Sequence, residues 1–186
     1  MSTQPRPYVT SEEYLRIDRE SEARSEYFDG AIYPLPGLTL NHALITANLS
    51  GGLTTQLKDR PCVATASSLK VQTRPGRSYF YPDIVVFCGK PRFVGGEHDM
   101  LGDATLIIEV LSPSTRDYDR GLKFVEYRRM PSLQDYLVVE QDQVSVEHYR
   151  RQDDGSWNVA NSPSLPPSSI SHPFSAACAS PTFTSG

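Results

Sequence analysis

Short apolar runs separated by turn signals predict most of the strands in this chain. Residues 84–87 and 106–111 are almost continuously apolar and rich in β-branched side chains, which indicates largely buried strands. Asp29-Gly30 and Asp154-Gly155 each separate two apolar segments and predict hairpin turns. The segment 144–150 alternates apolar and polar residues, as a half-exposed antiparallel strand does. We expect one further strand over residues 62–72.

Three segments have the apolar spacing of helices. The first begins at Thr10 or Ser11, where a capping hydroxyl precedes two acidic residues. The second covers residues 42–58, with a stripe formed by Ile45, Leu49, Leu53 and Leu57. Gly51 and Gly52 either weaken this helix or allow close packing against a sheet. The third follows the hydroxyl-rich segment 112–115 and ends before Pro131, with Tyr118, Leu122 and Val125 on its apolar side.

Length and composition indicate one folded domain over residues 1–160. The chain has 186 residues, enough for one substantial core. Residues 161–186 contain no charged side chain and are rich in Ser and Pro, which predicts a disordered tail. No segment is apolar enough for a signal peptide or a membrane helix, so we expect a cytoplasmic protein. The three cysteines are unevenly spaced and are interpreted as structural thiols.

Two carboxylates within apolar runs are the main candidates for chemistry. Asp83 precedes one predicted buried strand and Glu109 lies inside another, where a carboxylate is costly unless it is paired, protonated or bound to a cation. Adjacent strands would bring both acids together, and the carbonyl of Val110 could add a third oxygen ligand for Mg²⁺ or Mn²⁺. Lys123 could orient or deprotonate a water there. The alternatives are that Asp83 caps a turn and that Lys123 pairs with Asp119 on the surface.

Other polar residues allow a structural and a functional interpretation. His42 is either a partly exposed residue near a helix cap or a histidine directed at the site. Glu97, His98 and Asp99 could bind a metal, but an adjacent triplet in a Gly-rich loop is usually solvated. Seven basic side chains are either solvated or contact phosphates: Lys70, Arg74, Arg77, Arg116, Arg120, Arg128 and Arg129. The net charge of −4 counts against general coating of nucleic acid.

Several segments together resemble the Uma2 family (DUF820), restriction-endonuclease-like proteins of the PD-(D/E)xK nuclease superfamily. They are HALITANLSGGL, YPDIVVF, IIEVLSPSTRDYDRGLKFVEYRR and PSLQDYLVVEQDQVSVEHYRR. The resemblance covers roughly Tyr8 to Val159 and implies an α/β (α+β) fold with a mixed central sheet flanked by helices. It implies metal-binding roles for Asp83 and Glu109, with supporting roles for Glu26 and His42.

The resemblance has two departures. The superfamily lysine two residues after the acid would fall on Leu111, so Lys123 in the pattern Asp119-x-x-x-Lys123 is the expected substitute. Family members also end with an apolar strand and a short helix, and the end of this chain does not resemble that ending. The implied function is a Mg²⁺-dependent endonuclease acting on DNA, and the analogy with the family implies a homodimer. The alternative is a catalytically inactive nuclease-like domain that binds nucleic acid or a partner protein; a two-carboxylate glycosidase would need an aromatic sugar platform that we do not find.

Overall fold

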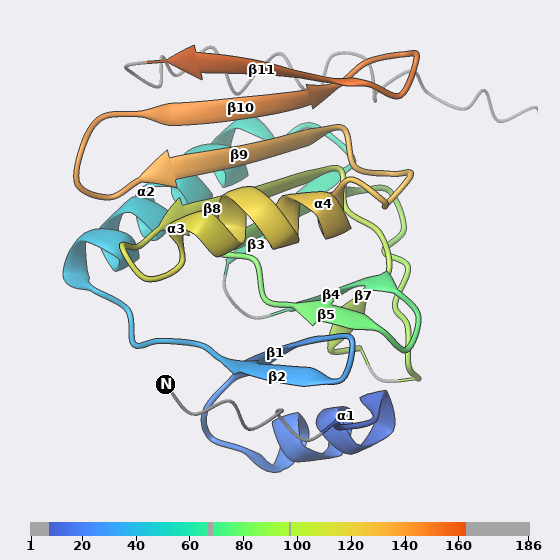
Figure 1. The fold of residues 1–186 in the computed structure, drawn as a ribbon. Coiled ribbons are helices and arrows are strands. Elements are labelled where there is room, and N and C mark those ends of the chain that lie inside the picture. Colours follow the sequence, from blue (N-terminus) through green and yellow to red (C-terminus); the bar gives the residue numbers. More distant parts are fainter. Residues whose placement is uncertain (1–7, 67–68, 97, 163–186) are drawn as a thin grey trace, which may run out of the picture.

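Two mixed β-sheets form the framework of the protein (Figure 1). The computed structural model describes residues 8–66, 69–96 and 98–162. The six-stranded sheet has the spatial order β11 (Trp157–Ser162), β10 (Val146–Arg151), β9 (Asp135–Glu140), β8 (Leu106–Leu111), β6 (Ile84–Cys88) and β3 (Cys62–Ala66). The five-stranded sheet has the order β2 (Ala31–Pro34), β1 (Ser25–Phe28), β5 (Ser78–Phe80), β4 (Lys70–Arg74) and β7 (Met100–Leu101).

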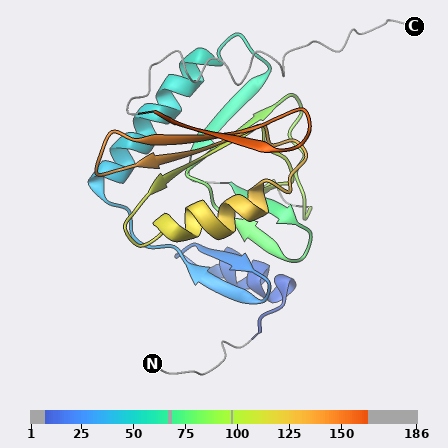
Figure 2. The ribbon, with the colours of Figure 1, turned by 45° about the horizontal axis from the view of Figure 1, so that its top comes forward.

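Helices cover both faces of the six-stranded sheet (Figure 2). Helix α2 (Leu40–Gln56) packs on one face, where Leu53 contacts a cluster that includes Ile84 and Val86. The opposite face carries Val85 and a second helix made of α3 (Arg116–Tyr118), the π-helical turn η1 (Asp119–Lys123) and α4 (Phe124–Tyr127). Successive residues of a strand point to opposite faces, so β6 and β8 can be apolar throughout and bury both sides.

The five-stranded sheet carries its own small aromatic core. Tyr14 of α1 (Ser11–Glu20) stacks on Tyr27 and Tyr79, with ring centroids 5.0 and 5.6 Å away. Val71 and Phe80 of the same sheet join the core beneath the α3–η1–α4 helix. The two sheets are therefore tied together through one apolar cluster.

The expected fold class, a mixed sheet flanked by helices, is confirmed, as are both hairpin turns and the caps of two helices. Thr10 accepts a hydrogen bond from Glu13, and Thr39 caps α2. In the first hairpin, Asp29 and Gly30 have φ values of 45° and 89°, the left-handed pair that a tight two-residue turn requires.

Other expectations were wrong. The single strand expected over residues 62–72 is two strands, β3 and β4, in different sheets. Val125, expected on the apolar side of the third helix, is 38% exposed. Close packing at Gly51 and Gly52 is absent, because a Cβ at either position would meet no atom within 4 Å.

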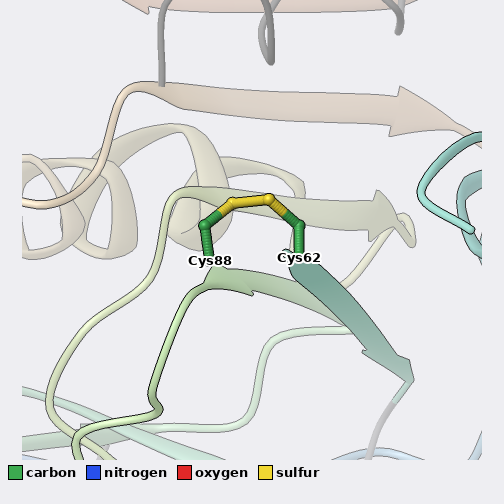
Figure 3. The surroundings of a disulfide bond; sticks show 2 residues. All are labelled: Cys62 and Cys88. Carbon is green, nitrogen blue, oxygen red and sulfur yellow. A yellow bond between two sulfur atoms is a disulfide. The ribbon is translucent and has the colours of Figure 1, made fainter. Parts of the chain in front are cut away.

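Cys62 and Cys88 form a disulfide rather than the expected free thiols (Figure 3). They lie directly opposite each other in the antiparallel pair β3–β6, which explains how residues 26 positions apart in sequence meet. The spacing of the cysteines alone did not show this register. Disulfides persist mainly in oxidising compartments, so the bond and the expected cytoplasmic location point in opposite directions.

The expected domain boundary at residue 160 falls within β11, which continues to Ser162. The remainder of the expected tail, residues 163–186, lies outside the described residues. In the part of the chain that is described, no helix combines the length and apolar character needed to cross a membrane.

Candidate active site

Asp83 and Glu109 lie on neighbouring strands, as expected. Asp83 immediately precedes β6, and Glu109 is in β8. The antiparallel register pairs Ile84 with Ile108, which makes the two acidic residues cross-strand neighbours. The backbone N–H of Val110 donates a hydrogen bond to Oδ2 of Asp83 at 2.8 Å and so fixes this carboxylate against β8.

Lys123 is buried among three carboxylates. Its Nζ lies 2.9 Å from Oε1 of Glu26, 3.0 Å from Oε1 of Glu109 and 3.3 Å from Oδ1 of Asp119. The predicted inward direction of Lys123 is therefore confirmed. The alternative, a surface pair with Asp119, was wrong about burial: the contact exists, but both side chains are buried.

Two further groups hold the carboxylates around Lys123 in place. The hydroxyl of Tyr127 donates to Oε1 of Glu109 at 2.9 Å, and the backbone N–H of Tyr81 donates to Oε1 of Glu26 at 2.9 Å. Sequence analysis did not identify either residue as part of the site. Tyr127 stands four positions after Lys123 and thus on the same helical face, which was the available signal.

The π-helical turn is the local feature that directs Lys123 and Asp119 inward. It covers Asp119–Lys123 and contains Gly121, which is exposed. One turn with the wider i→i+5 pattern shifts the following side chains around the helix axis. This shift also accounts for the exposure of Val125, which regular helical spacing placed on the apolar side.

His42 lies in the first turn of α2 and is buried, so the interpretation as a partly exposed cap residue was wrong. Its Nε2 lies 3.1 Å from Oδ2 of Asp83. The hydrogen bond with Asp83 raises the pKa of His42 above its usual value, although burial opposes this. The Thr39 cap holds the start of the helix where the imidazole can reach the strand.

Burial and charge set the protonation states around Lys123. Burial raises the pKa of Glu109 well above its usual value, and the charge of Lys123 only partly offsets this. Burial alone would lower the pKa of Lys123, but Glu109 and Glu26 raise it well above its usual value. The surrounding carboxylates therefore favour the protonated form of Lys123, whereas burial favours its neutral form.

The donor set suits a hard cation better than a soft one. Asp83 and Glu109 supply carboxylate oxygens, and Glu26 and Asp119 add negative charge nearby, against one buried lysine. Mg²⁺ prefers one or two carboxylates completed by waters. Within residues 8–66, 69–96 and 98–162, no group of three or more His, Cys, Asp or Glu side chains is spaced to enclose a metal ion. Asp83 and Glu109 are therefore ligands of the type that Mg²⁺ prefers, and the described residues form no closed transition-metal site.

The two described residues of the loop triplet, His98 and Asp99, do not join the site. Asp99 pairs with Arg19 at 3.3 Å and with Lys70 at 3.5 Å, and His98 packs against the ring of Phe93. Glu97 lies outside the described residues.

Most of the seven basic residues pair with acids of the same chain. Arg116 and Arg120 both contact Glu140, and Arg74 contacts Glu126 at 2.7 Å. Lys70 and Arg77 bind aspartates, and Arg129 contacts Glu126. Arg128 lies over the ring of Phe124 instead. These pairs compete with the phosphate contacts that the sequence allowed.

A pocket of about 530 Å³, including its open mouth, gives access to the site. Its wall contains Asp83, Glu109 and Lys123, with His42 at the side of α2. Residues 35–39 also line the pocket and contribute apolar side chains. A water or substrate oxygen that enters this pocket therefore meets two carboxylates and an ammonium group.

The two-sheet α+β fold with this acidic site is that of a nuclease-like protein. A similar solved structure is the crystal structure of a "putative nuclease belonging to DUF820" from Anabaena variabilis ATCC 29413, with a TM-score of 0.67 and 23% sequence identity. The similarity covers 83% of this chain and 86% of that one, and at this identity it establishes the fold.

The chain belongs to the Uma2 family, whose description is "Putative restriction endonuclease" and whose profile matches residues 11–177. Two proteins of Synechocystis sp. (strain ATCC 27184 / PCC 6803 / Kazusa) are similar over most of their length. Protein sll1609 is 36% identical over 149 residues, covering 80% of this chain and 84% of its own. Protein slr1290 is 39% identical over 157 residues, covering 84% and 82%. Both carry the name "Uncharacterized protein".

Proposed function

We propose that the protein is a Mg²⁺-dependent endonuclease that hydrolyses phosphodiester bonds in DNA. The observation that carries the proposal is the position of Lys123, whose ammonium contacts Glu109 and Glu26 at the pocket that Asp83 also lines. Leu111 cannot supply the superfamily lysine, and Lys123 reaches the same pair of strands from the following helix. Family membership supports nuclease chemistry, whereas the metal and the DNA substrate are part of our proposal.

In this proposal Asp83, Glu109 and the carbonyl of Val110 would hold Mg²⁺ or Mn²⁺. The bound cation would supply charge neutralisation at the phosphate and a lower pKa for an attacking water. The protein's own part is positional: the hydrogen bonds from His42 and from the N–H of Val110 fix Oδ2 of Asp83. The Tyr127 hydroxyl does the same for Glu109.

Lys123 is expected to act as a cation rather than as a base. Its charge would stabilise the negative charge that develops on the phosphate oxygens, as positioned cationic groups do in phosphoryl transfer. Its protonated state follows from Glu109 and Glu26, which raise its pKa. The proton of the attacking water must then pass to a carboxylate or to solvent.

A nuclease assay with matched variants tests the proposal. Supercoiled, linear duplex and single-stranded DNA are incubated with Mg²⁺, with Mn²⁺ and with EDTA. The wild type should cut only with a divalent cation. Asp83→Asn and Glu109→Gln should each lose activity while the fold stays nearly unchanged. Asp117→Asn, an exposed change on the same helix, is the control and should cut normally. Cleavage in EDTA, or by both site variants, would refute the metal site.

The alternative is an inactive domain that binds nucleic acid or a partner protein. One observation favours its second form, the binding of a partner protein: most of the basic side chains are already paired with acids and are less available for phosphates. The same preparation decides between the two. An inactive domain should show DNA or partner binding that is unchanged by Asp83→Asn and no cleavage under any metal condition. Size-exclusion chromatography of that preparation tests the expected homodimer.

A further inference from the structure

A second pocket lies beside the proposed catalytic pocket and contains two tyrosines. It measures about 720 Å³, including its open mouth, and is lined by Glu26, Tyr33, Leu35, Tyr118 and Lys123, among others. Four residues line both pockets: Leu35, Pro36, Thr115 and Lys123. Lys123 thus stands between them, and a ligand could reach into both at once.

The aromatic side chains of this pocket form a platform. Tyr33 of β2 and Tyr118 of α3 stack with their ring centroids 5.4 Å apart and an interplanar angle of 28°. Both side chains are half-buried. Stacked aromatic rings with an accessible face bind other flat rings, and nucleobases stack on such rings irrespective of sequence.

The pocket also contains an unpartnered acceptor. Glu26 is fully buried, and its Oε1 is engaged by Lys123 and by the N–H of Tyr81. Its other oxygen, Oε2, makes no hydrogen bond of normal geometry within the described residues. The Tyr118 hydroxyl makes none either, although it lies close enough to Glu26 for that carboxylate to raise its pKa. A buried carboxylate oxygen without a donor is costly, so a ligand that brings an N–H group would gain from binding there.

The charge of the pocket argues against phosphate as its occupant. Lys123 is the cationic residue among those that line it, and three carboxylates already surround that ammonium. Burial and then the negative charge of Glu26 raise the pKa of Tyr118, so its hydroxyl remains a neutral donor. A neutral, flat ring with an N–H edge matches these walls.

We propose that this second pocket binds an unstacked nucleobase next to the bond that is cut. The base would stack on the face of Tyr33 that Tyr118 does not cover, because Tyr33 and the Lys123 ammonium already lie against the Tyr118 ring. It would donate from its amino group to Oε2 of Glu26, while its neighbouring phosphate lies in the first pocket. Adenine and cytosine present an amino group beside an acceptor nitrogen, which suits the carboxylate and the hydroxyl together, whereas thymine has no amino group. A base inside a duplex cannot enter, so the favoured substrate class is single-stranded DNA or DNA with unpaired nucleotides.

This inference rests on the proposed nuclease function and is tested by binding as well as cleavage. Fluorescence anisotropy is measured with short labelled oligo(dA), oligo(dC), oligo(dT) and a duplex, in Ca²⁺, with gels to verify that the DNA stays intact. The wild type should bind single strands more tightly than duplex, and oligo(dA) and oligo(dC) more tightly than oligo(dT). Tyr33→Leu should weaken single-strand binding by about tenfold or more, the usual effect of losing one stacked ring.

Matched variants separate stacking from base recognition. Tyr33→Phe keeps the ring and should bind as the wild type does. Tyr118→Phe keeps its ring but loses the hydroxyl, and should reduce the preference for oligo(dA) and oligo(dC) over oligo(dT). Tyr8→Leu, at an exposed tyrosine that lines neither pocket, is the control for a general loss of aromatic surface. Melting curves by circular dichroism verify that each variant is folded.

The two proposals fail in different ways. A wild type that cuts DNA while Tyr33→Leu and Tyr118→Phe bind every oligonucleotide normally would overturn the base pocket and leave the nuclease intact. Stronger binding to duplex than to single strands would also overturn it. A wild type that neither binds nor cuts any DNA would overturn both.

Discussion

Lys123 has a larger structural role than its place in the sequence suggested. If Lys123 were only one charge near a metal, its removal should cost little stability, because it would open no apolar cavity. In the structure the ammonium is buried and is shared by Glu26, Glu109 and Asp119. Breaking such a group by removing one partner leaves buried charges without compensation.

Lys123→Ala should therefore reduce both stability and activity. We expect a loss of about 3–5 kcal/mol in the free energy of unfolding, measured by urea denaturation. Cleavage should fall by about a hundredfold or more when measured below the melting temperature of the variant. Lys58→Ala, at an exposed lysine, should change neither quantity. A Lys123→Ala variant with normal stability would show that the carboxylates are protonated or bound to another cation.

The double change Glu109→Gln with Lys123→Met separates the effect of Lys123 on stability from its effect on cleavage. It removes one buried charge of each sign, so the protein should regain part of the stability that Lys123→Ala loses, while cleavage stays absent. If the double variant is less stable than Lys123→Ala, the stability loss of Lys123→Ala does not come from an uncompensated buried charge.

The residues of the site differ in how far the sequence could identify them. Asp83 and Glu109 were identifiable because a carboxylate within a buried strand needs a partner. For His42 the sequence left two interpretations open, because its contact with Asp83 joins residues 41 positions apart and depends on how α2 packs on the sheet. The protonation of Lys123 was also inaccessible, since it depends on two carboxylates that come from other strands.

Among the elements, the π-helical turn shows why periodicity alone misplaced part of a helix. The segment DRGLK has no spacing that distinguishes a π-turn from an α-helix, and the wider turn is stabilised by the contacts of Asp119 and Lys123 with the core. The strands β6 and β8, by contrast, were predictable because a short apolar run rich in β-branched residues favours a buried strand over other structures.

The glycines of α2 and of the first hairpin should respond to alanine in opposite ways. Gly51→Ala should raise the free energy of unfolding by about 0.5–1 kcal/mol, because the site is helical, exposed and has space for a Cβ. Gly30→Ala should destabilise by more than that amount, because φ is +89° and the new Cβ would clash with the ring of Tyr8. Chemical denaturation of both variants tests the contrast; equal effects would contradict it.

Asp29 gives the same hairpin a dependence on pH. Partial burial alone would raise the pKa of Asp29, but hydrogen bonds from Arg77 and Arg74 outweigh it and lower the pKa below its usual value. A lowered pKa in the folded state stabilises the protein above the unfolded-state pKa, and this contribution is lost as the pH falls through the folded-state value.

Asp29→Asn tests this contribution, because asparagine also tolerates the left-handed conformation at this position. The change should cost about 0.2–1 kcal/mol at pH 7, the usual range for partly exposed ion pairs. The difference from the wild type should shrink as the pH falls below about 4. A difference that is independent of pH would assign the effect to the turn backbone instead of the charge.

For the whole molecule, the sequence predicted the class of fold better than its division into two sheets. Residues 62–72 look like one strand because β3 and the start of β4 both contain residues that favour strands and lie close together in the chain. Only long-range pairing, of β3 with β6 and of β4 with β5, shows that they belong to different sheets. The disulfide was missed for the same reason, since its partners meet through that pairing.

The disulfide should contribute to global stability without affecting the site. Its sequence separation of 26 residues corresponds to about 3.5 kcal/mol in the loop-entropy description. Cys62→Ala with Cys88→Ala should lower the free energy of unfolding by about that amount and leave cleavage unchanged, because Cys88 is at the opposite end of β6 from Asp83. Mass spectrometry after thiol alkylation verifies the bond in the wild type; free thiols there would contradict the structure.

The groups around Lys123 come from widely separated parts of the chain and from both sheets. Glu26 is in β1 of the five-stranded sheet, Glu109 is in β8 of the six-stranded sheet, and Lys123 lies on the helix that packs between them. No single one of these segments supplies all the groups of the site. A chain still emerging from the ribosome must reach past Lys123 and dock both sheets before this constellation exists. The proposed DNA cleavage would therefore begin only when synthesis and folding of the chain were nearly complete.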